Sequence, residues 1–238
     1  KLFLFDFMNV KKLCDGCGDC NDKSPLFKTL TAEELKIMDT DRYSVRFREG
    51  EVILKQGTKA DYLISIIEGL GKTCIEGHNE RNLILDYVKA GRLVGGPAAH
   101  MGDKHRSSLI AVQETLVCFI DKNNFSKVLA LNGLFSEKVL IHCSGNYLSA
   151  LERMVGLSQK QMHGRIADAL IYLSKEIFGT NVIGSEISRQ DMADYTSMSK
   201  DSAIRILKEL ERDGIIALDG KRIEILSDQR LQEISQRG

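Results

Sequence analysis

The stretch "EISRQDMADYTSMSKDSAIRILKELERDGIIALDGKRIEIL", residues 186–226, decides the fold. Ser188 predicts a helix start, because its hydroxyl can cap the first turn and an acid follows three residues later. A turn at "TSMS" leads to Ser199, which predicts the cap of a second helix. The Asp219-Gly220 pair then predicts a type I′ turn between two strands. Helix, turn, helix and hairpin together form the plan of a winged helix-turn-helix.

The second predicted helix separates apolar from polar side chains. Its inner face holds Ala203, Ile206, Leu207 and Leu210, and its outer face holds Lys200, Asp201, Ser202, Arg205 and Lys208. On a helix that enters the major groove, an arginine can bind guanine bidentately and an aspartate can accept from the cytosine amino group. We therefore predict that Asp201, Ser202 and Arg205 read bases. The alternative is that Asp201 and Arg205, four residues apart, form only an ion pair on a solvated helix.

Residues that can hold phosphates surround this helix. Side chains with N–H groups bind phosphate oxygens, and here they are Arg189, Gln190, Lys200, Lys221 and Arg222. The predicted DNA-binding set is Arg189, Gln190, Ser199, Lys200, Asp201, Ser202 and Arg205. Its partner would be double-stranded DNA, and the order of the elements carries this prediction because the local charge is balanced.

The rest of the chain predicts a second domain and a connecting helix. Thr31 and Glu34 form a capping-box pattern at the start of a short helix. From Arg46 to about Ile120, short alternating apolar segments separated by glycines predict a barrel, roll or sandwich. From Asn124 on, apolar residues recur every three to five positions, which predicts a short helix and then a long one. The long helix would pair with its copy in a dimer or, alternatively, pack only on its own barrel.

Composition bounds the class of protein without naming it. The 238 residues suffice for two modest domains, and 33 basic residues balance 33 acidic ones, so charge alone indicates no partner. No apolar run has the length of a membrane span, and the opening "KLFLFDFMN" is interrupted by Asp6, unlike a signal peptide. We therefore expect a cytoplasmic protein with no membrane partner.

At this point the chain resembles the cyclic-AMP receptor protein and fumarate–nitrate reduction regulator (CRP/FNR) superfamily of bacterial transcription factors. The resemblance spans residues 25–226 and includes "FREGEVILKQGTKADYLISIIEGLGKTCIEG", "GRIADALIYLSKEIFG" and the helix-turn-helix stretch. Arg205 stands at the family's guanine-contacting arginine. Asp201 stands where the family usually has glutamate, and Ser197 where it often has glycine, which leaves the half-site sequence open.

The resemblance implies an α+β fold in four parts. These are an N-terminal cysteine-containing segment (1–24), a cyclic-nucleotide-binding-like β-roll that senses an effector (25–125), a dimerisation helix (126–158) and a winged helix-turn-helix DNA-binding domain (159–238). It also implies a homodimer that regulates transcription, is not an enzyme, and contacts RNA polymerase if it is an activator.

The effector pocket implied by the resemblance lacks one residue of the cyclic-nucleotide binders. In those relatives a Gly-Glu pair holds the ribose and an Arg-Ser pair holds the cyclic phosphate. Here Gly95 is followed by Gly96 in the place of the glutamate, while Arg106 and Ser107 are retained. Arg106 can bind an anion or pair with a nearby acid. Cyclic AMP is therefore not the expected effector.

The cysteines pose the remaining question about the signal. Cys14, Cys17 and Cys20 form a C-x-x-C-x-x-C loop, and Cys118 stands where the resemblance places the fourth ligand of an iron–sulfur cluster. The family's third loop ligand lies farther along, so the spacing departs from its pattern. An iron–sulfur cluster, a zinc site and thiols without metal all stay open, and Cys118 can equally be a core residue. Cys74 and Cys143 are expected in the core.

A redox enzyme or electron carrier is the alternative class. It would explain the cysteine loop, but it would leave the winged motif unused, and the chain has no glycine-rich cofactor loop at a strand–helix junction. Steep salt dependence of duplex binding would favour the regulator, and turnover of a reductant would favour the enzyme.

Overall fold

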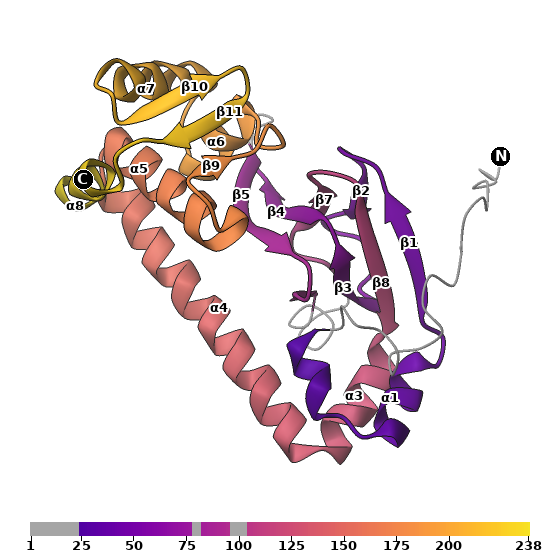
Figure 1. Ribbon diagram of the computed structural model, residues 1–238. Helices are drawn as coiled ribbons and strands as arrows, with labels where there is room; N and C mark the ends of the chain where they lie inside the picture. The colour runs from indigo at the N-terminus through magenta and orange to yellow at the C-terminus, as the bar shows by residue number, and fades with distance from the viewer. Residues whose placement is uncertain (1–23, 78–81, 96–103) are drawn as a thin grey trace. The chain divides into compact units, whose positions relative to one another are not determined.

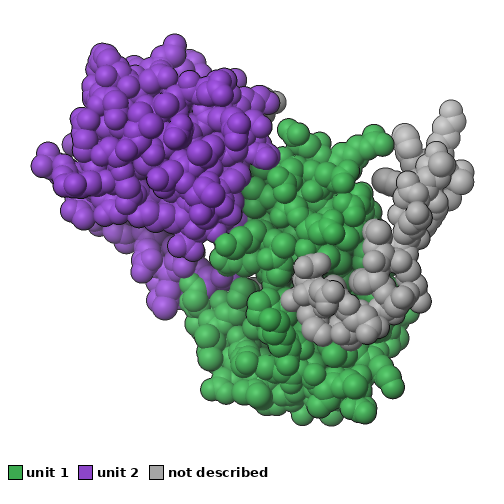
Figure 2. Space-filling model, viewed as in Figure 1, with its two compact units in different colours: residues 1–73, 88–145 green, residues 74–87, 146–238 purple. Residues whose placement is uncertain are grey.

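The computed structural model describes residues 24–77, 82–95 and 104–238 (Figure 1). The chain forms two compact units (Figure 2). The first comprises residues 1–73 and 88–145, and the second comprises residues 74–87 and 146–238. Among the described residues, no helix is long and apolar enough to cross a membrane.

Two four-stranded sheets make up the predicted roll. They follow the 3-10 helix η1 (Pro25–Thr29) and α1 (Ala32–Asp39). The strands are β1 (Tyr43–Phe47), β2 (Val52–Leu54), β3 (Tyr62–Glu68), β4 (Leu70–Glu76), β5 (Asn82–Lys89), β6 (Leu93–Val94), β7 (Ser108–Ala111) and β8 (Thr115–Asp121). One sheet has the order β1-β8-β3-β6 and the other β2-β7-β4-β5, and β8 pairs antiparallel with both β1 and β3.

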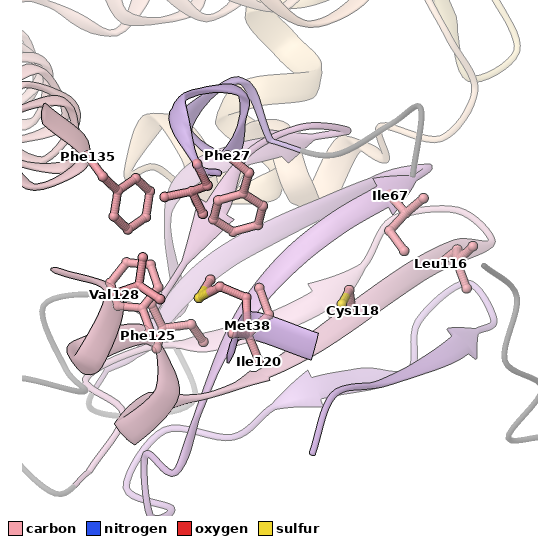
Figure 3. Packing of buried hydrophobic residues seen from close by; sticks show 11 residues of the cluster. Phe27, Met38, Ile67, Leu116, Cys118, Ile120, Phe125, Val128 and Phe135 are labelled. Carbon is pink, nitrogen blue, oxygen red and sulfur yellow. The ribbon is translucent and has the colours of Figure 1, made fainter. Parts of the chain in front are cut away.

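Apolar side chains from the sheets and the flanking helices form the core of the first unit. One cluster joins Met38 of α1 and Phe27 of η1 to Ile120 of β8 (Figure 3). The rings of Phe27 and Phe125 approach Phe135 at 6.2 and 5.6 Å between centroids. Helix α1 is fixed at its start by the predicted capping box, in which the Thr31 hydroxyl accepts from the Glu34 backbone. The short helices therefore close one end of the roll.

Gly69 makes the tight connection between β3 and β4 possible. Its φ is +92°, and a Cβ there would lie 2.5 Å from the carbonyl oxygen of Glu114 and 2.7 Å from the Thr115 hydroxyl oxygen. Glycine is the residue that tolerates both the left-handed backbone and the close approach. This position therefore accounts for one of the glycines that the sequence places between strands.

The predicted short and long helices are α3 (Lys122–Leu131) and α4 (Gly133–Gln159). Asp121 caps α3 by accepting from two backbone N–H groups. The start of α4 packs through Phe135, which is fully buried. Farther along, apolar side chains that repeat every seven residues are between 51% and 67% exposed in the single chain: Leu140, Ile141, Tyr147, Leu148, Met154 and Val155. Such a stripe is typical of a helix that pairs with another helix.

The second unit contains the winged helix-turn-helix. Its elements after α4 are α5 (Met162–Tyr172), a π-helical segment η3 (Leu173–Phe178), β9 (Val182–Ile183), α6 (Arg189–Thr196), α7 (Lys200–Arg212), β10 (Ile216–Asp219), β11 (Arg222–Ile225) and α8 (Asp228–Arg237). The wing sheet has the order β10-β11-β9, and β11 pairs antiparallel with both β10 and β9. The predicted α+β architecture is confirmed.

The wing turn differs from the prediction by one residue. Asp219 pairs with Arg222 in the hairpin, so the two loop residues are Gly220 and Lys221. Of these, Gly220 alone has a positive φ, of 57°. A positive φ at the first central residue only is the pattern of a type II′ turn, so the predicted type I′ turn at Asp219-Gly220 is wrong. The strand register, rather than the local Asp-Gly pair, sets the loop.

Candidate nucleic-acid interface

Two capped helices and a strained turn form the helix-turn-helix. The Ser188 hydroxyl accepts from the Asp191 backbone and the Asp191 carboxylate accepts from the Ser188 backbone, as the sequence predicts. Helix α6 ends at Ser197, which has φ 52° and ψ 52°. Ser199 then caps α7 by accepting from Ser202 N. A serine in the left-handed region thus makes a turn that glycine would make without strain.

Arg165 of α5 stabilises this turn by hydrogen bonds to its backbone. Its Nη1 donates to the carbonyl oxygens of Thr196 and Ser197 at 3.1 and 3.2 Å. These are carbonyls at the end of α6 that the helix itself cannot satisfy. The sequence analysis did not single out Arg165, because its partners lie more than thirty positions away along the chain.

Helix α7 buries one face and opens the other. Ala203, Ile206 and Leu207 are fully buried and Leu210 is 2% exposed, so the predicted inner face is confirmed. Lys200, Asp201 and Arg205 are exposed, and Ser202 is half-buried because its hydroxyl bonds the Ser199 cap. The side chains predicted to read bases therefore lie on the open face of a helix whose opposite face is fixed in the core.

Arg205 has a protein partner on this face. Its Nη1 donates to Oε1 of Glu209 at 3.0 Å, and Oε2 of Glu209 lies 2.7 Å from Nε2 of His163 in α5. The hydrogen bond from His163 is the main cause that lowers the pKa of Glu209, and Arg205 adds to it. In the described part of the chain, no ion pair joins Asp201 to Arg205. Arg205 thus forms its ion pair with Glu209 and not with Asp201, the acid that the alternative interpretation named.

Arg189 and Gln190 also have partners within the protein. Arg189 donates to the carbonyl oxygens of Gly220 and Lys221 at 3.1 and 3.2 Å and so ties the wing turn to α6. Burial lowers the pKa of Arg189. Gln190 donates to Asp194 at 2.8 Å. The other predicted phosphate contacts, Lys200, Lys221 and Arg222, are exposed. The wing is thereby held in a fixed place beside α6, with its lysine and arginine side chains open.

Arg153 of α4 is a half-buried cation that the sequence analysis missed. It donates to the carbonyl oxygens of Ile84 and Leu85 in β5 and, at 2.7 Å, to that of Tyr195 in α6. Its guanidinium carbon lies 4.0 Å from the centroid of the Tyr195 ring. Burial lowers the pKa of Arg153. One side chain of α4 therefore contacts both β5 and α6. No local sequence pattern predicts partners that are so distant in the sequence.

Aromatic rings extend the Arg153 contacts. Tyr195 stacks on Tyr172 of α5 with 5.5 Å between ring centroids, and the Tyr172 hydroxyl bonds the Asp86 carboxylate. Burial raises the pKa of both Tyr195 and Tyr87, so both phenols stay neutral. The first helix of the helix-turn-helix, α6, thus packs on α5 through stacked tyrosine rings.

The predicted effector residues lie in and beside an undescribed segment. Gly95 follows β6 with a φ of +92°, and Gly96 lies outside the described residues. Arg106 is exposed and Ser107 half-buried in the bend before β7. In the described ranges, Arg106 makes no ion pair, so the alternative that it pairs with a nearby acid finds no partner there. The structure thus describes three of the four predicted pocket residues.

Cys118 lies in β8 within the core of the first unit (Figure 3). It is 5% exposed, and its Sγ accepts from Nη1 of Arg42 at 3.6 Å. Cys14, Cys17 and Cys20 lie outside the described residues. Within the described ranges, no group of three or more histidine, cysteine or acidic side chains is placed to hold a metal ion. Cys74 is buried, as expected, and Cys143 is half-buried with its pKa raised by burial.

Comparisons with known proteins fit both halves of this architecture. The family model "Cyclic nucleotide-binding domain" matches residues 44–132, and the model "Crp-like helix-turn-helix domain" matches residues 164–234. The chain is 23% identical over 228 residues to "Transcriptional activator protein FnrL" of Cereibacter sphaeroides, which covers 92% of this chain and 91% of that protein. It is 23% identical over 184 residues to "cAMP-activated global transcriptional regulator CRP" of Escherichia coli, covering 76% of this chain and 88% of that protein.

A solved structure shows the same fold. FixK2 from Bradyrhizobium japonicum superposes with a TM-score of 0.74 at 21% identity, covering 81% of this chain and 96% of that one. The roll matches the first family model, and the capped helices with their wing match the second. The chain belongs to the CRP/FNR superfamily of bacterial transcription regulators.

Proposed function

We propose that the protein is a homodimeric regulator that binds double-stranded DNA in a sequence-specific manner through α7. The observation that carries this proposal is the open face of α7, which presents Lys200, Asp201 and Arg205 while its other face is buried. Side chains near the start of such a helix meet base edges in the major groove. Arg205 would bind a guanine, and Lys221 and Arg222 would hold phosphates. The protein would act in the cytoplasm, and as an activator it would also contact RNA polymerase.

Replacement of Arg205 by alanine tests this reading. We expect a loss of about 1–3 kcal/mol of discrimination at one base pair of each half-site, with non-specific affinity largely retained. The measurement is competition between duplexes that differ at single base pairs. Arg212→Ala is the control, because Arg212 is a 76% exposed side chain at the far end of the same helix. An Arg205 variant that keeps the wild-type base preference would rule out the assigned role.

The apolar stripe of α4 is proposed as the dimer seam. Ile141 and Leu148 are 62% and 58% exposed in the single chain, and they stand seven residues apart on one face. Exposed apolar patches of this kind mark interaction surfaces. We expect the double change Ile141→Glu and Leu148→Glu to give monomers in sedimentation velocity. The matched control is Ser149→Glu, which adds one charge at an exposed position on another face of the same helix. A double variant that sediments like wild type would overturn the seam.

We propose Cys118 as the ligand that the roll would contribute to an iron–sulfur cluster held with Cys14, Cys17 and Cys20. What supports it is the Arg42 guanidinium, whose Nη1 lies 3.6 Å from the Cys118 sulfur, because hydrogen bonds from neighbouring side chains orient metal ligands. A cluster of this kind would supply sensitivity to oxidants. The test is iron, sulfide and zinc content after anaerobic purification of wild type, Cys118→Ser and the control Cys74→Ser. Iron lost only in the Cys118 variant supports the proposal, and wild type without iron overturns it.

Cyclic AMP is not the effector in this proposal. Gly96 offers no carboxylate to the ribose hydroxyls, and a polar group left unpaired in a pocket costs about 1–3 kcal/mol. Calorimetry with cyclic AMP is expected to show no binding at micromolar concentrations. Micromolar affinity would show that Arg106 and Ser107 suffice.

A further inference from the structure

Glu209 connects the base-reading arginine of α7 to a different helix. One carboxylate oxygen accepts from Arg205 at 3.0 Å, and the other lies 2.7 Å from His163 of α5. The side chain of Glu209 is 28% exposed, while that of Arg205 is 55% exposed. The acid is therefore sheltered and bound at both oxygens, whereas most of the guanidinium is open.

An ion pair between residues four apart on an exposed helix is ordinarily weak, because two flexible side chains must be ordered together. Here one of the two is already fixed. His163 belongs to α5, and it holds Glu209 from outside α7. Glu209 also stands between the buried residues Leu207 and Leu210, so its backbone is fixed in the core. Arg205 consequently donates to a carboxylate that a second helix also binds.

The remaining N–H donors of Arg205 suit the binding of a guanine. A guanidinium has five N–H donors, and the pair with Glu209 occupies one on Nη1. Nη2 and Nε make no hydrogen bond to the described residues and can meet the O6 and N7 acceptors of a guanine. A long side chain that is ordered before binding loses less conformational freedom when it binds. The carboxylate can therefore prepare the arginine without taking the edge that reads the base.

We propose that Glu209 is a positioning residue for Arg205 in DNA recognition, with His163 holding Glu209 in place. The inference rests on the proposed role of Arg205 in reading guanine. The acid can have two effects on DNA binding. A carboxylate near DNA repels all duplexes alike, whereas a positioning residue changes the ratio of the affinities for a correct and an incorrect duplex. That ratio cancels any uniform change of charge.

The experiment uses the full-length dimer and two duplexes. One is the sequence that wild type selects from a randomised duplex pool, and the other differs at the guanine whose preference Arg205→Ala abolishes. Their affinity ratio is measured for wild type, Glu209→Ala, Glu209→Gln and His163→Ala. We expect the ratio to fall about three- to tenfold in both Glu209 variants and less in His163→Ala, relative to the roughly 5- to 150-fold discrimination of a good bidentate contact. Asp213→Ala, which removes another acid at the end of α7, is the control and should leave the ratio unchanged.

The outcomes distinguish this inference from the function on which it rests. If Arg205→Ala changes no base preference, the proposed function fails. If Arg205→Ala abolishes a preference while both Glu209 variants keep the wild-type ratio, the positioning role is overturned. In the Arg205→Ala background, removal of Glu209 should have no further effect on the ratio. The isosteric Glu209→Gln keeps the test open should the alanine variant fold poorly.

Discussion

Replacement of Arg153 by methionine measures what the half-buried guanidinium contributes to the second unit. Arg153 donates to three backbone carbonyls and covers the Tyr195 ring. Methionine retains an apolar stem of similar length but has no donor, so the three carbonyls lose their charged partner. The change therefore removes hydrogen bonds while most of the packing volume is kept.

The magnitude follows from these contacts. Each hydrogen bond to a charged group contributes roughly 1.5–3 kcal/mol, so the three together give roughly 4.5–9 kcal/mol. The desolvation cost of the half-buried charge, up to several kcal/mol, is relieved in the variant and offsets part of this loss. We expect a net loss of about 3 kcal/mol in the free energy of unfolding. For a chain of this size that is a decrease in Tm of about 6–12 °C.

The assay is urea unfolding followed by circular dichroism, together with a thermal scan, on wild type, Arg153→Met and Arg212→Met. Arg212 lies 3.7 Å from Asp213 and its side chain is 76% exposed, so its replacement should change the free energy of unfolding by less than about 0.5 kcal/mol. If Arg153→Met were as stable as the Arg212 variant, the guanidinium would not be the link that holds β5, α4 and α6 together.

Three further variants test the local geometry of the chain. Ser197→Gly should raise the free energy of unfolding by about 1 kcal/mol, since Ser197 has φ 52° and glycine adopts this conformation without strain; a thermal scan measures it, and no gain would refute strain at the turn. Gly69→Ala should cost about 3 kcal/mol, because its Cβ would lie 2.5 Å from the Glu114 carbonyl oxygen; a urea melt within about 1 kcal/mol of wild type would contradict this packing. Glu34→Gln should destabilise the protein at neutral pH. The backbone N–H of Thr31 lowers the pKa of Glu34 in the folded state, so this stabilisation is present above the unfolded pKa and is lost as pH falls through the folded one. Urea melts over a pH series should show wild type and variant converging in acid, and a difference independent of pH would refute the assignment.

Local signals in the sequence were enough to predict the two helices of the helix-turn-helix, α6 and α7. Ser188 and Ser199 cap α6 and α7 as predicted, because a cap depends on residues within one turn. The inner face of α7 was also predictable, since a period of 3.6 residues fixes which side chains share a face. The hairpin was predicted, but its turn was misplaced by one residue, because the register with β11 decides which residues form the loop.

Contacts between distant segments could not be predicted in this way. Arg153 and Arg165 act on carbonyls of residues that are far along the chain, and a carbonyl has no signature in the sequence. Two acids lie four residues from Arg205, Asp201 before it and Glu209 after it. Only the position of His163 in α5 distinguishes the two. Long-range geometry therefore decides which of several equivalent local pairs forms.

The measurement that tests the central claim most directly is selection of bound duplexes from a randomised pool by the wild-type protein, both aerobically and anaerobically, followed by sequencing. In the proposed homodimer, two copies of α7 related by a twofold axis would read two half-sites on one face of the duplex. The account predicts an enriched inverted repeat whose half-site centres lie about one helical turn, roughly 10 base pairs, apart. A pool with no enriched sequence under either condition, or a single motif without a repeat, would contradict a homodimer that reads DNA through α7.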